Sequence, residues 1–201
     1  MINRELYMEQ ITPFIDKPFV KVITGIRRCG KSVVLRLIRE ELLRRGVSED
    51  YIIYMNFESF EWIDMKEAKA LYAHIREATK ASGKYYILLD EIQEVTDWEK
   101  AVNAFLVDLD VDIYVTGSNS RLLSSEFSTY LAGRYVAFHI MTLSFREYLL
   151  FHDLPLTISV SDRKTEFLKY LRMGGFPAIH TANYDYNAIY KIVYDIYSSV
   201  I

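Results

Sequence analysis

Residues 25–32 read GIRRCGKS, and this short stretch constrains the fold more than any other part of the chain. It follows an apolar run at 19–24 that is typical of a buried strand. It precedes residues 31–46, where apolar positions 34, 35, 38 and 42 repeat at helical spacing. A glycine near each end of the loop lets the backbone curl, so that successive N–H groups point inward beside the start of the helix. The sequence therefore predicts a strand, a tight loop and a helix, with a cradle for an anion at their junction.

The same alternation of apolar runs and helical patterns continues along the chain. Strands are predicted at 19–24, 51–58, 85–91, 111–118 and 134–140, and helices at 31–46, 65–80, 98–109 and 120–133. Strands that alternate with helices favour a parallel sheet covered by helices on both faces, and runs such as YYILL fit strands buried on both sides. After residue 143 the pattern is helical, at 144–154, 162–177 and 184–201. We predict an α/β core at 1–143 followed by a helical segment at 144–201.

Composition narrows the class of protein. The chain has 201 residues, 51% of them hydrophobic, and a net charge of -3, which argues mildly against a nucleic-acid partner. Cys29 is the single cysteine, so no disulfide forms within the chain. Neither a signal peptide nor an apolar run long enough for a membrane span is present. We expect a cytoplasmic protein without a membrane partner.

The loop matches G-x-x-x-x-G-K-[ST] at every fixed position. In that pattern the backbone N–H groups cradle phosphate oxygens, Lys31 reaches the β- and γ-phosphates, and Ser32 offers its hydroxyl to Mg²⁺. The alternative, a glycine-rich turn with a surface lysine, does not explain the flanking strand and helix. The predicted nucleotide-binding residues are Gly25, Ile26, Arg27, Arg28, Cys29, Gly30, Lys31, Ser32 and Val33.

A pair of acids ends the apolar run YYILLDEIQ. Because ligands bind at the carboxyl ends of strands in open α/β sheets, Asp90 is predicted to hold Mg²⁺ through water. Glu91 is predicted to orient the attacking water or take its proton. The alternative is that the pair simply forms an acidic turn at the strand end. This alternative is less favoured because a phosphate-binding loop precedes the pair in the sequence.

Two further positions are weaker candidates. The strand at 111–118 ends in the small polar residues Thr116, Ser118 and Asn119, and the last two are predicted to bond the γ-phosphate or the water unless they simply form a turn. Arg134 is predicted to stabilise charge on the transferred phosphoryl group, within its own chain or in a neighbour's site. It is equally well explained as a strand-edge arginine paired with a surface acid, and Arg121 is a weaker version of the same idea.

The last helical segment is apolar around much of its girth. Tyr190, Tyr194 and Tyr197 form one stripe, and Ile189 and Ile196 belong to a second. Such a helix needs cover on more than one side, so we expect further chain, a partner or a groove of its own domain to cover it.

The segments LDEIQ, TGSNSRLLS, GRY and LSFREYL, in this order after the loop, resemble those of prokaryotic AAA-like ATPases. The similarity runs from about residue 20 to residue 177. It implies a P-loop core with a five-stranded parallel sheet in three layers, in which strand 111–118 lies between the first and third strands. It also implies ATP and Mg²⁺ as ligands and a separate C-terminal domain. By position it implies catalytic roles for Lys31, Glu91, Asn119 and Arg134, and metal binding by Ser32 and Asp90.

These observations favour an ATPase that uses Mg²⁺-dependent hydrolysis of ATP to switch an attached domain or protein partner, with a homo-oligomer as an option. The alternative is a nucleotide-binding regulatory module without hydrolysis, with membership of a DNA-associated protein as one option in spite of the net charge. A GTPase is disfavoured because the sequence holds no Asn-Lys-x-Asp motif. The four histidines are dispersed and lack metal-ligand spacing, which indicates structural roles; they are His74, His139, His152 and His180.

Overall fold

The computed structural model describes residues 3–117, 122, 131–181 and 184–198. The chain divides into two compact units. The larger unit consists of Glu5–Gly25 and Lys31–His139, and the smaller one lies within Met1–Arg4, Ile26–Gly30 and Ile140–Ile201. The residues between the two glycines of the loop therefore group with the C-terminal part of the chain.

The larger unit contains a five-stranded sheet in the order β2-β3-β4-β1-β5. The pairs β2–β3, β3–β4 and β4–β1 are parallel, so β4 lies between the first and third strands as the resemblance implied. The strands are β1 (Val20–Gly25), β2 (Ile52–Asn56), β3 (Tyr85–Asp90), β4 (Val111–Gly117) and β5 (Tyr135–Ile140). The helices are α1 (Glu5–Ile11), α2 (Lys31–Arg44), α3 (Ala68–Ala78) and α4 (Trp98–Asp108).

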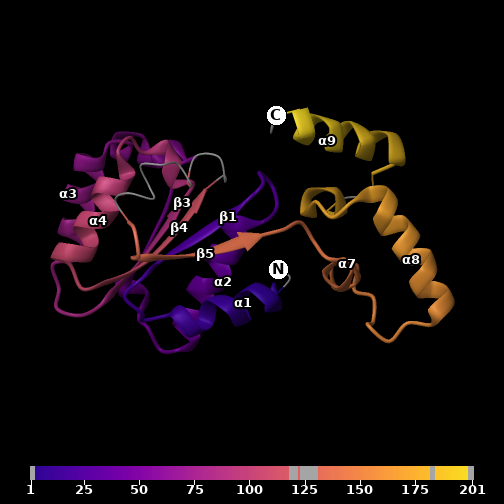
Figure 1. Cartoon of the computed structure of the whole chain (residues 1–201), viewed down its shortest axis with the longest axis horizontal. Helices are drawn as coiled ribbons and strands as arrows, with labels where there is room; N and C mark the ends of the chain where they lie inside the picture. The colour runs from indigo at the N-terminus through magenta and orange to yellow at the C-terminus, as the bar shows by residue number, and fades with distance from the viewer. Residues whose placement is uncertain (1–2, 118–121, 123–130, 182–183, 199–201) are drawn as a thin grey trace. The chain divides into compact units, whose positions relative to one another are not determined.

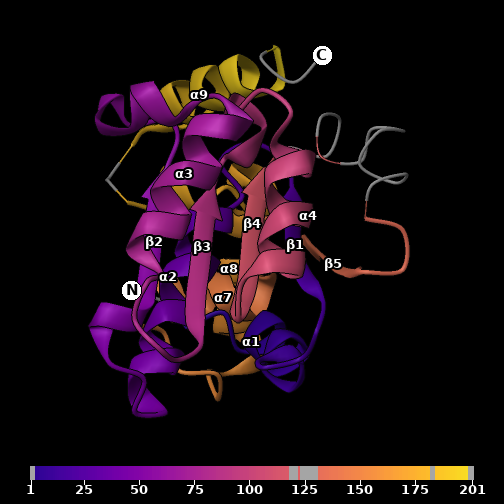
Figure 2. The ribbon, with the colours of Figure 1, turned by 90° about the vertical axis from the view of Figure 1, so that its left-hand side faces the viewer.

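Helices cover both faces of this sheet (Figure 1). Figure 2 looks onto the face that α3 and α4 cover, and their apolar residues join the strands in one core cluster. On α2, the four apolar positions that the sequence singled out, Val34, Leu35, Ile38 and Leu42, are fully buried. Every residue of β1 and β3 is buried, as expected for central strands of a parallel sheet. The three-layer α/β prediction is confirmed.

Local departures from the sequence prediction occur between the strands. The segment predicted as a helix from residue 65 begins instead with a 3-10 helix at Phe60–Met65, and α3 starts only at Ala68. Most of the helix predicted at 120–133 lies outside the described residues. The short helix α1 precedes the first strand and was not predicted.

A buried polar network joins the amino ends of β1 and β4. Lys21 forms an ion pair with Asp112, and both side chains are almost completely buried. The other Asp112 oxygen accepts hydrogen bonds from the Asp16 amide at 2.9 Å and from the Tyr114 hydroxyl at 2.8 Å. The Lys21 ammonium also donates to the Lys17 carbonyl at 3.0 Å. This network fixes the relative register of two strands that lie far apart in the sequence.

The smaller unit is helical after β5. Its helices are α7 (Phe145–Phe151), α8 (Val160–Met173) and α9 (Tyr186–Ser198). A capping box starts α7, since the Ser144 hydroxyl accepts from the Glu147 amide while the Glu147 carboxylate accepts from the Ser144 amide. The segment before α7 pairs with Gly175, whose carbonyl accepts from the Leu143 amide at 2.7 Å. A Cβ on Gly175 would lie 2.4 Å from the Leu143 carbonyl oxygen, so this close approach requires glycine.

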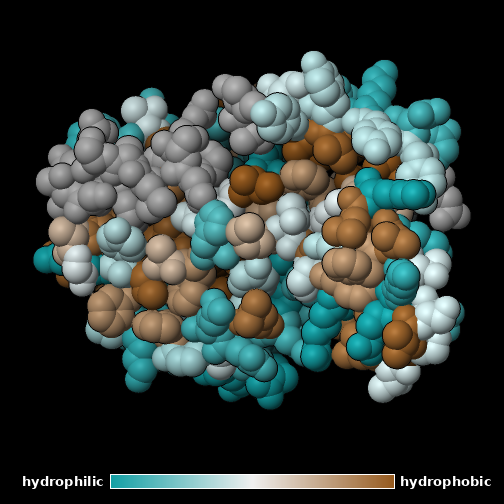
Figure 3. All heavy atoms as spheres, turned by 45° about the vertical axis from the view of Figure 1, so that its right-hand side comes forward, coloured by the Kyte–Doolittle hydropathy of each residue, from teal (hydrophilic) through white to brown (hydrophobic). Residues whose placement is uncertain are grey.

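The last helix buries one side and exposes the other. Ile189 and Ile196 are buried, whereas Tyr190, Tyr194 and Tyr197 are exposed. Figure 3 turns the side with the C-terminal helices toward the viewer and shows hydrophobic residues at that surface. On α8 the exposed apolar side chains include Phe167, Leu168 and Leu171. Among the described residues, no helix is long and apolar enough to cross a membrane.

Candidate functional site

The carboxyl ends of β3 and β4 bring an acid and a hydroxyl together in the larger unit. Asp90, the last residue of β3, is fully buried. One of its carboxylate oxygens accepts a hydrogen bond from the Thr116 hydroxyl at 2.5 Å, and the other accepts from the Tyr54 hydroxyl at 3.0 Å. Burial and the neighbouring Asp90 charge raise the pKa of Tyr54 above its usual range, so this phenol remains a donor at neutral pH. Both donors orient the buried carboxylate and compensate part of its lost hydration.

Glu91, the first residue after β3, has a strained backbone conformation. Its φ of 53° lies in the left-handed region, which is uncommon for a residue with a side chain. The Thr116 hydroxyl accepts a hydrogen bond from the Glu91 amide at 2.9 Å while it donates to Asp90. One hydroxyl therefore links the Asp90 carboxylate to the Glu91 backbone amide.

The Glu91 carboxylate lies between a cation and an amide. Its Oε1 is 3.3 Å from the Lys31 ammonium, and its Oε2 accepts a hydrogen bond from Gln93 Nε2 at 2.5 Å. The Lys31 ammonium also donates to the Gly25 carbonyl at 3.3 Å, and its side chain is only 4% exposed. Gln93 Oε1 is buried and has no hydrogen-bond partner among the described residues. The lysine at the start of α2 and the acid after β3 thus lie at the same edge of the sheet.

The loop between Gly25 and Lys31 contains three residues with positive φ. Gly25, Arg28 and Gly30 have positive φ values of 154°, 66° and 105°. Ile26, Arg27 and Arg28 are exposed, and Cys29 is buried with its amide donating to the Ile26 carbonyl at 3.2 Å. At its amino end α2 begins with Lys31, so the first N–H groups of the helix follow directly on the loop.

Of the remaining candidates, the structure describes only Arg134. Ser118, Asn119 and Arg121 lie outside the described residues. Arg134 donates through Nη1 to the Asn103 side chain of α4 at 2.9 Å, and its carbonyl accepts from the Val20 amide at 2.9 Å. Val20 is the first of the six residues of β1, so the Arg134 backbone lies about 16 Å from the carboxyl end of that strand at roughly 3.3 Å per residue.

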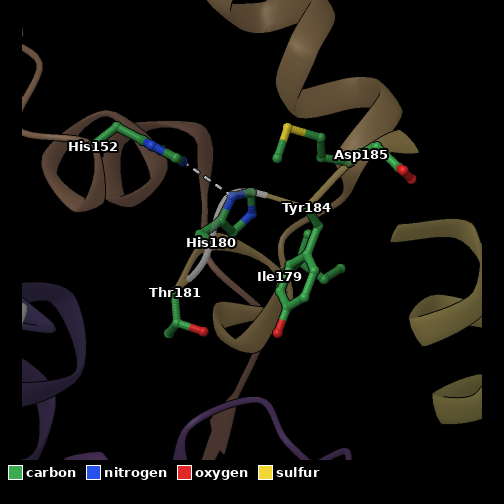
Figure 4. Close-up of a pocket in the computed structure, with 7 residues that line it drawn as sticks. His152, Ile179, His180, Thr181, Tyr184 and Asp185 are labelled. Carbon is green, nitrogen blue, oxygen red and sulfur yellow. Dashed lines mark hydrogen bonds between the residues drawn. The ribbon is translucent and has the colours of Figure 1, made fainter. Parts of the chain in front are cut away.

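A second arrangement of polar groups occurs in the smaller unit. His152 Nε2 and His180 Nδ1 are 3.1 Å apart, and His180 Nε2 is 2.9 Å from the Gly174 carbonyl at the end of α8. The two histidines are 28 positions apart in the sequence, and the fold brings His152, at the end of α7, next to His180 in the 3-10 helix Pro177–His180. Burial lowers the pKa of His180. Figure 4 shows the two imidazoles at a pocket of about 380 Å³ that is also lined by Thr181, Tyr184 and Asp185.

Across the part of the chain that the structure describes, no three histidine, cysteine or acidic side chains are grouped to hold a metal ion. The pair instead joins two helix ends, with the neutral imidazole of His180 donating to Gly174 and accepting from His152.

Sequence reasoning missed four residues that contact the candidate site or its loop. Tyr54 and Gln93 hold the two acids, and Thr116 was noted only as a small polar residue at a strand end. Arg4 donates to the carbonyl of Cys29 in the loop at 3.1 Å. The strand register could have pointed to Tyr54 and Thr116, whereas no sequence signal marks Arg4.

Comparisons with known proteins agree with this fold. The model of a family described as an AAA domain matches residues 17–149. An uncharacterized protein of Haemophilus influenzae is 43% identical over 184 residues, which cover 91% of this chain and 46% of that protein. An uncharacterized protein of Methanocaldococcus jannaschii is 35% identical over 184 residues, which cover 89% of this chain and 39% of that protein. The chain therefore spans less than half the length of these curated relatives.

Two solved structures share the fold at low sequence identity. AMPPCP-bound DnaA from Aquifex aeolicus has a TM-score of 0.56 at 15% identity, with 96% of this chain and 62% of that chain covered. The Aeropyrum pernix ORC1 protein in complex with DNA has a TM-score of 0.55 at 16% identity, with 98% of this chain and 66% of that chain covered. At these identities the likeness concerns the fold alone.

Proposed function

Because the chain belongs to the AAA domain family, we propose that it binds ATP with Mg²⁺ through the 25–32 loop and hydrolyses it to switch an attached domain or partner. The observation that carries this proposal is the 3.3 Å ion pair between Lys31 and Glu91, next to the buried carboxylate of Asp90. A cation that starts a helix, a buried acid and a second, partly exposed acid at one sheet edge are the groups that phosphoryl transfer to water requires.

The residues fit Mg·ATP on chemical grounds. The donor set of Asp90 and the Ser32 hydroxyl consists of hard oxygens, which Mg²⁺ prefers. Both Asp90 oxygens already accept protein hydrogen bonds, which favours contact with the metal through water. The positive φ values of Gly25 and Gly30 fit a loop whose N–H groups converge on phosphate oxygens. When bound, Mg²⁺ supplies positive charge that neutralises the phosphate oxygens.

Lys31, Glu91 and Thr116 then have different roles in the proposed reaction. When ATP binds, Lys31 exchanges its ion pair with Glu91 for contact with the phosphates. A phosphate group with two negative charges attracts the ammonium more strongly than one carboxylate does. Glu91 keeps its bond from Gln93 and is free to accept a hydrogen bond from water, which it orients for attack. Thr116 ties the Asp90 carboxylate to the backbone amide of Glu91.

Arg134 is proposed as an arginine that acts in a neighbouring copy. Its backbone pairs with Val20, at the amino end of β1, so its own loop is out of reach of the side chain. An assembly of several copies would bring the arginine to the next site. A mixture of Lys31→Ala and Arg134→Ala chains would then regain turnover that neither variant shows alone, and the absence of any regain would exclude the role in trans.

The proposal is tested by ATP binding and turnover of the purified chain. Lys31→Ala should weaken ATP binding at least tenfold, since it removes a charged contact of about 1.5–3 kcal/mol. Glu91→Gln should retain binding and lose turnover. Arg39→Ala is a matched control, because it removes a cation from the exposed surface of the same helix. Unchanged binding and turnover in Lys31→Ala would refute the assignment.

A nucleotide-binding module without hydrolysis is the alternative. It is favoured if the ligand-bound chain keeps Glu91 engaged with Lys31, so that water is never oriented. In that case ATP binds to wild type and Glu91→Gln alike, and neither releases phosphate above the uncatalysed rate.

A further inference from the structure

Arg4 lies in the smaller unit with its guanidinium almost completely buried. Nη1 donates to the Cys29 carbonyl at 3.1 Å, Nη2 donates to the Met141 carbonyl at 2.8 Å, and Nε donates to Glu147 Oε1 at 2.5 Å. The side chain is 3% exposed. A planar fork of five donors suits this task, because it reaches two carbonyls and a carboxylate at once.

The contact with Cys29 determines which way a loop amide points. In a trans peptide the carbonyl of one residue and the N–H of the next point in opposite directions. Arg4 holds the Cys29 carbonyl on its own side of the loop, so the Gly30 N–H points away from Arg4. Gly30 has a φ of 105°, and a Cβ there would lie 3.3 Å from Arg4 Nη1, so glycine leaves room for the guanidinium.

The other end of Arg4 is tied to the start of α7. Glu147 Oε1 pairs with Arg4, while Glu147 Oε2 accepts from the Ser144 amide at 2.8 Å and the Ser144 hydroxyl at 2.9 Å. The capping acid of α7 therefore serves the helix with one oxygen and the arginine with the other. This gives a physical role to the S-F-R-E part of LSFREYL, which the proposed mechanism does not use.

We propose that Arg4 is a positioning residue for phosphate recognition: through the Cys29 carbonyl it presets the Gly30 N–H as a donor to a ligand phosphate. The inference rests on the proposed function, since it assumes that the loop binds phosphate. It predicts that Arg4 matters for every ligand that shares the phosphate group, whatever its base. It also predicts that the loss of ligand affinity in Arg4 variants depends on the geometry of the guanidinium donors and not on the charge of the side chain.

The test compares the binding of ATP, ADP and inorganic pyrophosphate by calorimetry. Arg4→Lys keeps the positive charge beside Glu147 but cannot donate to both carbonyls and the carboxylate. We expect Arg4→Lys to weaken the binding of all three ligands about tenfold, which is the effect of losing one hydrogen bond to a charged group. Arg4→Met removes charge and donors together and should weaken them at least as much. If Arg4→Met does not fold, Arg4→Lys decides alone.

Two control variants separate positioning from stability. Glu147→Gln keeps a single acceptor oxygen, which serves either Arg4 or the Ser144 amide, while Nη1 and Nη2 of Arg4 keep their two carbonyls. It should lower thermal stability, and binding should stay within about twofold of wild type. Tyr148→Phe removes a buried hydrogen bond to Glu166 in the same unit without touching the loop. It should lower thermal stability and leave binding unchanged.

Nuclear magnetic resonance gives a readout that does not depend on turnover. In wild type, pyrophosphate should shift the Gly30 amide proton downfield, and Arg4→Lys should reduce that shift. Wild-type affinity in Arg4→Lys, or an equal loss in Tyr148→Phe, would overturn the inference. A wild-type chain that binds neither ATP nor pyrophosphate would overturn the proposed function and this inference with it, before any variant is compared.

Discussion

The buried pair of Lys21 and Asp112 allows a quantitative prediction about stability. Lys21→Met keeps an unbranched side chain of nearly the same length and removes the ammonium, which leaves a buried carboxylate without its cation. Breaking a buried pair in this way costs about 3–5 kcal/mol. Asp112 keeps two donors, from the Asp16 amide and the Tyr114 hydroxyl, so we expect the lower end, about 3 kcal/mol.

The reverse change should cost as much and add a dependence on pH. In Asp112→Asn the amide oxygen retains the bonds from Asp16 and Tyr114, but Lys21 is left as a buried charge. Burial lowers the pKa of Lys21 from 10.5, and Asp112 is the main group that opposes this shift. Without Asp112 the folded chain binds fewer protons than the unfolded one between the folded pKa and 10.5. The stability of Asp112→Asn should therefore rise with pH across that range.

The double variant isolates the interaction itself. Independent effects of about 3 kcal/mol each would add to about 6 kcal/mol. Because neither residue is charged in Lys21→Met/Asp112→Asn, no unpaired buried charge remains, and we expect a total near 3 kcal/mol. The coupling energy between the two positions should then be about 3 kcal/mol.

Urea unfolding followed by tryptophan fluorescence measures these values. Both tryptophans, Trp62 and Trp98, lie in the larger unit, so their signal reports on the unit that contains the pair. A loss of about 3 kcal/mol corresponds to about 6–12 °C in melting temperature for a chain of this size. A cost below about 1 kcal/mol for Lys21→Met, or additive single changes, would contradict the reasoning.

Three further outcomes are expected. Thr116→Val removes the hydroxyl that serves Asp90 and Glu91, so the larger unit should lose about 1–3 kcal/mol in urea unfolding, and an unchanged midpoint would count against it. Gln93→Met removes the donor to Glu91 and should lower kcat about tenfold with ATP affinity within about twofold; a change confined to affinity would contradict this. His180 has a pKa lowered by burial, so it stabilises the smaller unit above about pH 6.5 and loses that contribution as the pH falls. The difference in melting temperature between wild type and His180→Asn should therefore shrink from pH 7 to pH 5, and a constant difference would refute it.

The order and type of the core elements were predictable from local sequence. Apolar runs and helical spacing marked the strands and α2, because buried central strands and an amphipathic helix leave direct patterns. The order of the strands in the sheet came from the resemblance, since alternation alone does not say which strand lies beside β1. The Lys31 loop and the Asp90–Glu91 pair could be proposed from the sequence because phosphate-binding and acidic motifs have fixed residue types at fixed spacing.

The residues that support these groups were not predictable in the same way. Tyr54 and Thr116 reach Asp90 only because β2 and β4 flank β3 in a particular register. Arg4 lies 25 positions before Cys29 and 143 before Glu147, so its contacts depend entirely on tertiary structure. The same holds for His152 and His180, which are 28 positions apart.

The position of β1 in the sheet determines how long this strand remains unpaired during synthesis on the ribosome. Its partner β4 follows far along the sequence, and Lys21 and Asp112 are 91 positions apart. At about 5–20 residues per second, a ribosome needs on the order of 5–20 s to supply that partner. During this interval the apolar strand around Val22 and Ile23 has no neighbour, and Lys21 is the charged residue within it. A lysine near the amino end of a hydrophobic strand discourages contact between nascent chains, and its ion-pair partner Asp112 is synthesised only later.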